Sequence, residues 1–242
     1  MLNRLRHGKV SNASIYSLNV QNTRERIIYM KRILAIVLLF NLLLTLLGCE
    51  MSIDPNEGII EGGLIRGNCV TEISDAEFEL RMSFVAEAEK WLGANSLDGS
   101  HKPILTIYNN YTPLAQGYIV KETDKWCATF VSAIAISMDL TDIIPTECGC
   151  QRQIGLFDDL GCWEERDDYM PLPGDLIFYC TGNKLFGDCI GWSDHVGIVV
   201  GTRFGWIQVI EGNVNDTVTY RYIMVNDLSI RGFGIPNFSS KV

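Results

Sequence analysis

Basic residues are scarce in most of this 242-residue chain. Seven of its 20 lysines and arginines lie in residues 1–48, which hold only one of its 29 acidic residues. The remaining 13 bases and 28 acids leave residues 49–242 with a formal charge of −15. A surface of that sign repels nucleic acid, anionic lipid and anionic polymers at long range. The composition therefore excludes nucleic-acid binding and predicts that no basic patch holds a substrate.

No apolar run reaches the ~20 residues that a helix needs to span a bilayer. The longest covers residues 33–47, is broken by two polar residues, and directly follows Lys31 and Arg32. A basic start followed by an apolar stretch of this length is typical of a signal peptide. We therefore expect residues 1–48 to be a signal region, with translation starting at Met30.

The apolar run ends in residues 46–49 (LLGC), which resemble a bacterial lipobox, where the cysteine receives a lipid after cleavage. We expect Cys49 to carry that lipid and residues 49–74, rich in glycine and acids, to be a tether. An uncleaved membrane anchor, with Cys49 incidental, is the alternative. In both cases residues 75–242 are exported to the outer face of the cytoplasmic membrane or the cell wall, and their length fits one domain.

Histidines are few, which disfavours a zinc site. The chain holds His7 in the expected signal region, His101 in a polar stretch, and His195. The cysteines that come closest to a zinc-binding group are Cys148, Cys150, Cys180 and Cys189. Their spacing is irregular and no histidine accompanies them, so the sequence predicts no metal and no other cofactor.

Six cysteines remain when Cys49 and Cys127 are set aside, and in an exported domain they permit up to three disulfides. They are Cys69, Cys148, Cys150, Cys162, Cys180 and Cys189. Cys180 and Cys189 flank a loop that contains glycine, and they are the pair that we first expect to bond. An anaerobic environment would instead leave all six reduced.

Helical periodicity precedes strand-like segments along the chain. The spacing of apolar residues predicts helices over residues 75–92, 104–108, 124–138 and 151–160. Short β-rich segments follow at residues 176–179, 195–200, 206–211 and 218–224. This order predicts an α+β fold in which amino-terminal helices pack on one side of an antiparallel sheet. The chain contains no internal repeat.

Two helices have apolar positions that define an expected buried face. In residues 75–92 these are Phe78, Met82, Phe84, Val85 and Ala88. In residues 124–138 they are Cys127, Phe130, Val131, Ile134 and Met138, and we expect Asp124 to cap this second helix. Cys127 would then lie in the first helical turn, where N–H groups and the helix dipole favour the reactive thiolate. A buried structural cysteine is the alternative interpretation.

His195 begins a predicted strand, in which it shares a face with Gly197. The glycine would leave space beside the imidazole for the Cys127 helix to approach. The next strand ends in Glu211 and Asn213, and either side chain could orient the imidazole. We favour Glu211, because alternation places it on the inward face and Gly212 would break the strand before Asn213. A satisfied histidine at the core edge, with the two polar residues in a solvated turn, is the alternative.

These segments together resemble one family. Residues 126–132 (WCATFVS), 173–179 (PGDLIFY), 194–199 (DHVGIV) and 210–213 (IEGN) are similar, in this order, to the CHAP domain. CHAP domains are papain-like cysteine, histidine-dependent amidohydrolases and peptidases, related to the NlpC-type cell-wall endopeptidases. The resemblance covers residues 86–238.

The resemblance implies a role for each residue of the expected site. Cys127 would be the nucleophile, His195 the general base, Glu211 the residue that orients it, and Asn213 a supporting polar group. The substrate would be peptidoglycan, cut at an amide bond as an amidase or endopeptidase. Some members carry an acidic calcium-binding loop before the cysteine, but this chain has only Glu122 and Asp124 there, so we expect no calcium.

Two other functions fit the same sequence. An acyl transferase or transpeptidase would use the same cysteine and histidine with another acyl acceptor. A membrane-tethered binding module would use no catalytic residue at all. The sequence does not indicate the oligomeric state.

Overall fold

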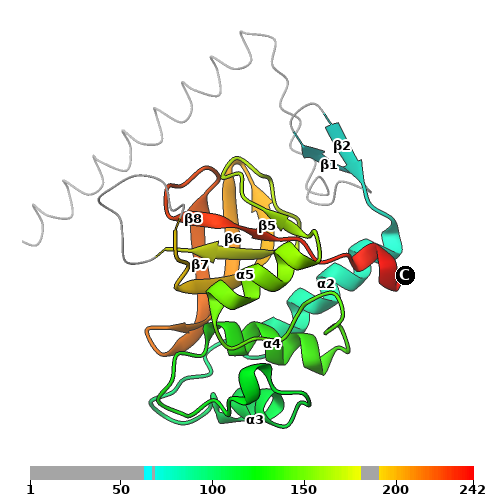
Figure 1. Cartoon of the computed structure of the whole chain (residues 1–242). Helices are drawn as coiled ribbons and strands as arrows, with labels where there is room; N and C mark the ends of the chain where they lie inside the picture. Colours follow the sequence, from blue (N-terminus) through cyan, green and yellow to red (C-terminus); the bar gives the residue numbers. More distant parts are fainter. Residues whose placement is uncertain (1–62, 67–68, 181–190) are drawn as a thin grey trace, which may run out of the picture. The chain divides into compact units, whose positions relative to one another are not determined.

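The computed structural model describes residues 63–66, 69–180 and 191–242 (Figure 1). The expected signal region, its start at Met30 and the expected lipid site at Cys49 lie outside these residues. Within the expected tether, β1 (Gly63–Arg66) and β2 (Cys69–Glu72) pair as antiparallel strands, a hairpin that the composition of this stretch did not predict. In the described part of the chain, no helix is both long and apolar enough to cross a membrane.

The described residues form four α-helices before the main sheet. They are α2 (Asp75–Glu89), α3 (Lys102–Asn109), α4 (Cys127–Ser137) and α5 (Cys150–Asp159). Each lies within a few residues of its predicted range. The Ser74 side chain caps α2 by accepting a hydrogen bond from the Glu77 N–H at 3.1 Å.

The predicted apolar face of α2 is partly wrong. Phe84, Val85 and Ala88 are buried as expected, but Phe78 and Met82 lie exposed. The helix turns Arg81 into the interior instead, because a buried carboxylate on the sheet side neutralises it. Apolar spacing alone does not reveal such a pairing.

A six-stranded antiparallel sheet follows the helices, so the fold is a mixture of α-helices and antiparallel sheet, as α+β predicts. Its strands, in spatial order, are β3 (Trp163–Glu164), β8 (Ile230–Gly234), β4 (Leu176–Tyr179), β5 (His195–Arg203), β6 (Trp206–Val214) and β7 (Thr217–Met224). Strands β4, β5, β6 and β7 were predicted. β3 and β8 were not, because one has two residues and the other contains two glycines.

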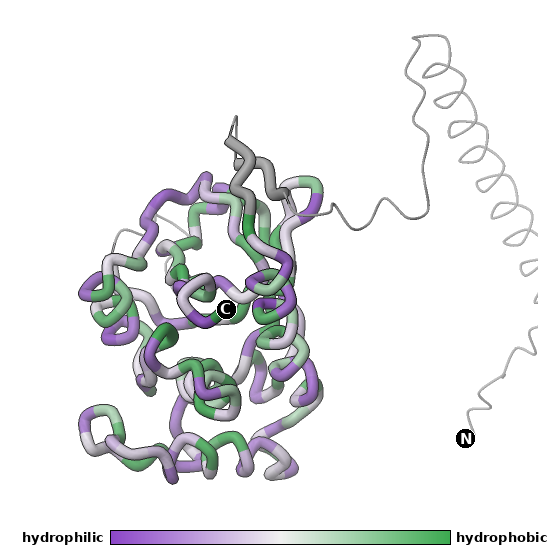
Figure 2. The backbone as a smooth tube through the Cα atoms, turned by 90° about the vertical axis from the view of Figure 1, so that its right-hand side faces the viewer, coloured by the Kyte–Doolittle hydropathy of each residue, from purple (hydrophilic) through white to green (hydrophobic). Residues whose placement is uncertain are grey.

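Each face of the sheet carries a hydrophobic cluster. Leu176 and Phe178 belong to the hydrophobic cluster on the helix side, whereas Ile177 and Tyr179 belong to a second cluster on the opposite face. Figure 1 shows α2, α3 and α4 gathered on one side of the sheet. In the backbone view of Figure 2, hydrophobic and hydrophilic residues are interspersed along the described part of the chain.

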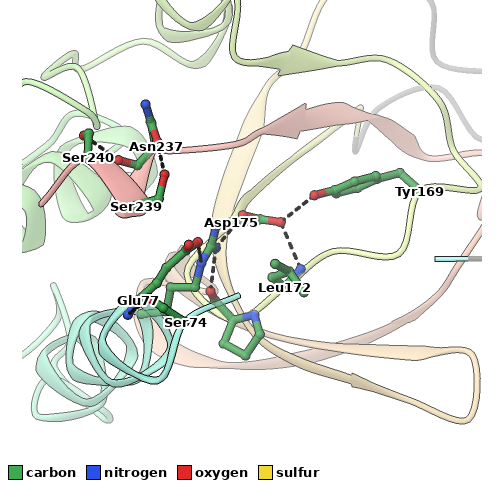
Figure 3. A network of polar contacts seen from close by, with 10 residues as sticks. Ser74, Glu77, Tyr169, Leu172, Asp175, Asn237, Ser239 and Ser240 are labelled. Atoms are coloured by element: carbon green, nitrogen blue, oxygen red, sulfur yellow. Dashed lines mark hydrogen bonds and ion pairs between the residues drawn. The ribbon is translucent and has the colours of Figure 1, made fainter. Parts of the chain in front are cut away.

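A buried polar network joins α2 to the start of β4 (Figure 3). Arg81 Nη1 donates to Asp175 Oδ1 at 2.9 Å, and Arg81 Nε donates to Glu77 Oε1 at 2.8 Å. The other oxygen of Asp175 accepts from the Tyr169 hydroxyl and the Leu172 N–H, each at 2.9 Å. These contacts satisfy a fully buried carboxylate and fix the helix layer to the strand that lies beside β5.

Candidate active site

Cys127 is the first residue of α4. The prediction that Asp124 caps this helix is wrong: its carboxylate accepts from the Lys121 N–H and the Tyr118 hydroxyl, each at 2.8 Å. Trp126 occupies the cap position and provides no side-chain cap, so the Cys127 sulfur lies directly at the helix N-terminus. Anions are favoured there by the helix dipole and the unpaired N–H groups.

The helix is buried on every side rather than along one stripe. Residues 127–135 are all buried, and Met138, expected in the apolar face, is the residue that follows the helix end. Only 5% of the Cys127 surface is exposed. The backbone that carries the expected nucleophile is therefore held by the core.

His195, the first residue of β5, interacts with both other members of the expected site. It lines the same cavity as Cys127 and interacts with it electrostatically, and its Nε2 lies 3.2 Å from Glu211 Oε2. Because Nε2 faces the carboxylate, Nδ1 is the ring nitrogen left for the thiol. The imidazole is only 8% exposed.

Glu211, on β6, is fully buried and accepts from Arg221 Nε at 2.8 Å and 2.9 Å through its two oxygens. Arg221 lies on β7, is partly exposed, and compensates the carboxylate charge that would otherwise be costly to bury. Sequence reasoning missed Arg221. Its position two residues from the apolar Ile223, on the same face of a predicted strand, was the available signal.

Two glycines allow these elements to approach, but not in the way that the sequence suggested. A Cβ on Gly197 would lie 2.7 Å from Glu211 Cγ, so this glycine makes room for the carboxylate and not for the Cys127 helix. The helix packs instead on Gly212, where a Cβ would lie 2.6 Å from Phe130 Cβ. The space that the Cys127 helix needs is thus provided by Gly212 and not by Gly197.

Asn213 follows in an irregular part of β6. The pairing with β7 shifts register between Glu211 and Val214, and Asn213 adopts a left-handed φ of 62°. Its side chain lines the same cavity as Cys127 and His195. Within the described residues, no hydrogen bond connects it to His195, so Glu211 is the polar residue in contact with the imidazole.

The electrostatics favour a thiolate and imidazolium pair. Burial opposes the charged imidazole, but the hydrogen bonds and charges of Cys127 and Glu211 outweigh it and raise the pKa of His195 to about 9. The hydrogen bond from Cys150 and the interaction with His195 hold the pKa of Cys127 well below its ordinary value, although burial acts in the opposite direction. The site can thus hold a charged nucleophile near neutral pH.

Cys150 is a further residue of this site that the sequence did not reveal. It is the first residue of α5, and its sulfur lies 3.6 Å from that of Cys127. The sequence placed it only among the six cysteines available for disulfides. Cys148, Cys150 and Cys162 are free thiols, so the six cysteines do not form the three disulfides that their number permits.

Cys180 is disulfide-bonded. Its expected partner, Cys189, lies outside the described residues, so this pairing stays a prediction. No cluster of three potential metal ligands occurs in the part of the chain that the structure describes.

A cavity of about 360 Å³ opens onto the thiol and the imidazole. It is lined by Lys125, Cys127, Asp194, His195, Asn213, Val214, Asn215 and Arg221. A second cavity, of about 440 Å³, shares Lys125 and also contacts Cys148 and Arg152. The polar lining suits a substrate rich in amide and charged groups.

Compared with known proteins, the chain matches no family model, and no curated protein is significantly similar to it.

Proposed function

We propose that this chain is an exported cysteine amidohydrolase with a papain-like fold of the CHAP type, which hydrolyses amide bonds in the peptide part of peptidoglycan. The observation that carries the proposal is that Cys127 and His195 line one cavity, while the buried Glu211 carboxylate lies 3.2 Å from His195 Nε2. A nucleophile at a helix N-terminus, a base beside it and a carboxylate that orients the base form the arrangement expected of thiol hydrolases. The wall as substrate follows from the resemblance of four segments to the CHAP domain and from the expected export.

The proposed reaction begins with attack of the Cys127 thiolate on the carbonyl carbon of an amide. The Cys127 N–H, at the start of α4, can donate to the oxygen that becomes negative. When the C–N bond breaks, His195 gives its proton to the departing amine, and a thioester remains. Water then attacks the thioester with His195 as base, the C–S bond breaks, and the carboxylate product leaves.

Glu211 supports both steps through His195. A buried carboxylate 3.2 Å from Nε2 fixes the ring orientation and favours the protonated form needed for the leaving amine. Arg221 donates to both oxygens of Glu211 and holds the carboxylate in place beside His195. We propose Asn213 as a polar contact for the substrate, because it lines the cavity without contacting the base.

The expected lipid on Cys49 would keep the enzyme at high local concentration near the wall. The negative charge of the chain does not attract it to anionic wall polymers. Peptidoglycan and the membrane are accordingly the proposed partners, and no nucleic acid is expected to bind.

The deciding experiment incubates the full chain with purified peptidoglycan and identifies the released fragments by mass spectrometry. Hydrolysis predicts fragments that have gained one water, with a new amine and a new carboxylate at the cut bond. Cys127→Ala, which exchanges one small side chain for another, should release none while keeping the fold. Fragments joined to a second amine would indicate a transferase, and retention on the wall without fragments would indicate a binding module.

A further inference from the structure

Two thiols meet at the centre of the site. Cys127 and Cys150 are 5% and 7% exposed, and their sulfur atoms are 3.6 Å apart. Each is the first residue of its helix, so the N-termini of α4 and α5 converge on one point. The mechanism proposed above uses Cys127 and has no step for Cys150.

The other free thiols do not share this arrangement. Cys148 interacts with Arg152, whose Nη2 lies 3.7 Å from its sulfur, and the Cys162 sulfur lies 3.6 Å from the Leu160 carbonyl oxygen. Among the free cysteines that the structure describes, only Cys150 contacts the nucleophile. The pairing is therefore particular to the reactive residue.

We infer that Cys127 and Cys150 form an oxidation-sensitive modification site, in which Cys150 captures the oxidised nucleophile as an intramolecular disulfide. A disulfide has an S–S length of about 2.0 Å, so the sulfurs need to approach by about 1.5 Å. The inference depends on the proposed function in one respect only: the loss of activity on disulfide formation presupposes that the chain is a hydrolase.

The chemistry requires a two-electron oxidant, for which a hydroperoxide is the simplest class. With hydrogen peroxide, the Cys127 thiolate attacks one oxygen, the O–O bond breaks, and the departing hydroxide takes the proton held by His195 to form water, giving Cys127 sulfenic acid. The Cys150 sulfur then attacks the Cys127 sulfur, the S–O bond breaks, and the departing hydroxide takes the Cys150 proton to form water. With hydrogen peroxide, two thiols are oxidised to one disulfide and the peroxide is reduced to two waters.

The reaction order follows from the charges of the pair. The hydrogen bond to Cys127, together with burial and the charge of the Cys127 thiolate, raises the pKa of Cys150 well above its ordinary value, so it stays protonated while Cys127 is a thiolate. Oxidation of Cys127 to sulfenic acid removes that negative charge. Cys150 then ionises more readily, at the moment when an electrophilic sulfur lies in contact with it.

Capture as a disulfide has a consequence for recovery. A sulfenic acid that is not captured proceeds to sulfinic acid, which thiol reductants do not reverse. The disulfide is reversed by them. Export removes the chain from the reducing cytosol, so a reversible route matters at this cysteine.

The test treats the full chain with hydrogen peroxide, then divides it for digestion with and without dithiothreitol. The wild type should yield a peptide in which Cys127 and Cys150 are crosslinked and which dithiothreitol separates. Its wall-degrading activity should fall at least about tenfold with peroxide and return with dithiothreitol, since the disulfide is the reversible product. Cys150→Ser should lose activity to peroxide and not regain it, with two oxygens added at Cys127. Cys148→Ser, which alters a neighbouring free thiol, should behave like the wild type.

Each variant is compared with its own untreated activity, so an effect of the substitution on hydrolysis does not enter. A wild type that forms sulfinic acid at Cys127, with no crosslinked peptide, would overturn the inference. The crosslink is measured without substrate, so it also separates the two proposals. If the crosslink forms in a chain that never cuts peptidoglycan, the inference about Cys127 and Cys150 stands and the proposed hydrolase activity is rejected. If Cys150→Ser fails to fold, the wild-type peptide map alone decides.

Discussion

Replacement of Glu211 by glutamine removes one negative charge next to His195 and keeps the size of the side chain. In the wild type the thiolate and imidazolium pair persists from the lowered pKa of Cys127 up to the pKa of His195, about 9. Activity should therefore fall on the alkaline side as His195 loses its proton near pH 9. Without the Glu211 charge the pKa of His195 falls, so the alkaline limb of the pH–rate profile moves downward.

The size of that movement follows from the geometry. At the 3.2 Å between His195 Nε2 and Glu211 Oε2, two full charges interact by about 5 kcal/mol at an effective dielectric constant of ~20. Arg221 donates to both oxygens of the carboxylate and offsets much of this attraction. The value of about 5 kcal/mol is therefore an upper limit on the contribution of Glu211 to the pKa of His195. A charged hydrogen bond contributes about 1.5–3 kcal/mol net, which corresponds to a displacement on the order of 1–2 pH units.

The assay is kcat/KM for release of wall fragments, measured against pH, because this ratio reports the ionisation of the free enzyme. Asn213→Ala is the matched control: the residue lines the cavity but does not contact His195, so its alkaline limb should stay in place. If Glu211→Gln keeps the wild-type limb while Asn213→Ala moves it, the assignment of Glu211 is wrong. The site would then be closer to a Cys-His-Asn arrangement.

Three further substitutions test the fold and the anchoring. Arg81→Met leaves the buried Asp175 carboxylate without its cation and should lower the free energy of unfolding in urea by about 3–5 kcal/mol, whereas the exposed Arg166→Met should change it by less than about 1 kcal/mol. Gly212→Ala places a methyl group against α4 and should lower the free energy of unfolding by about 1–3 kcal/mol and weaken activity. Wild-type stability together with wild-type activity would contradict the close approach of Gly212 to Phe130. Cys49→Ala should abolish the lipid-dependent mass increase in cells, and an unchanged mass with membrane retention would favour an uncleaved anchor.

The elements with a clear period were predictable from the sequence, and the contacts between them were not. Four helices and strands β4 to β7 appear near their predicted places, because apolar residues recur at helical spacing in the first part of the chain and form short β-rich runs in the second. β8 was missed because Gly232 and Gly234 interrupt its pattern. Arg81 was missed because a buried charge depends on a partner almost a hundred residues away, and no local pattern shows that partner.

The same distinction applies to the candidate site. Cys127, His195 and Glu211 stand out because their residue types suit one chemistry. The structure places Cys127 and His195 on one cavity and Glu211 in contact with His195. Cys150 has no such signal, since its meeting with Cys127 arises only when the starts of two helices converge. Asp124 misled in the opposite direction: a suitable capping residue at a suitable distance bonds Lys121 and Tyr118 instead.

The burial of α4 on all sides determines how the two walls of the cavity should differ in hydrogen exchange. An amide in the middle of α4 cannot open without disrupting the surrounding core, so its exchange should require unfolding of the whole domain. Across the cavity, Asn213, Asn215 and Asp216 adopt left-handed backbone conformations in and after the irregular end of β6. The amides of these residues should exchange through local opening, and far faster than the amides in the middle of α4. The nucleophile would thus stand on the least yielding wall of the cavity, and adaptation to different peptides would fall to the opposite wall.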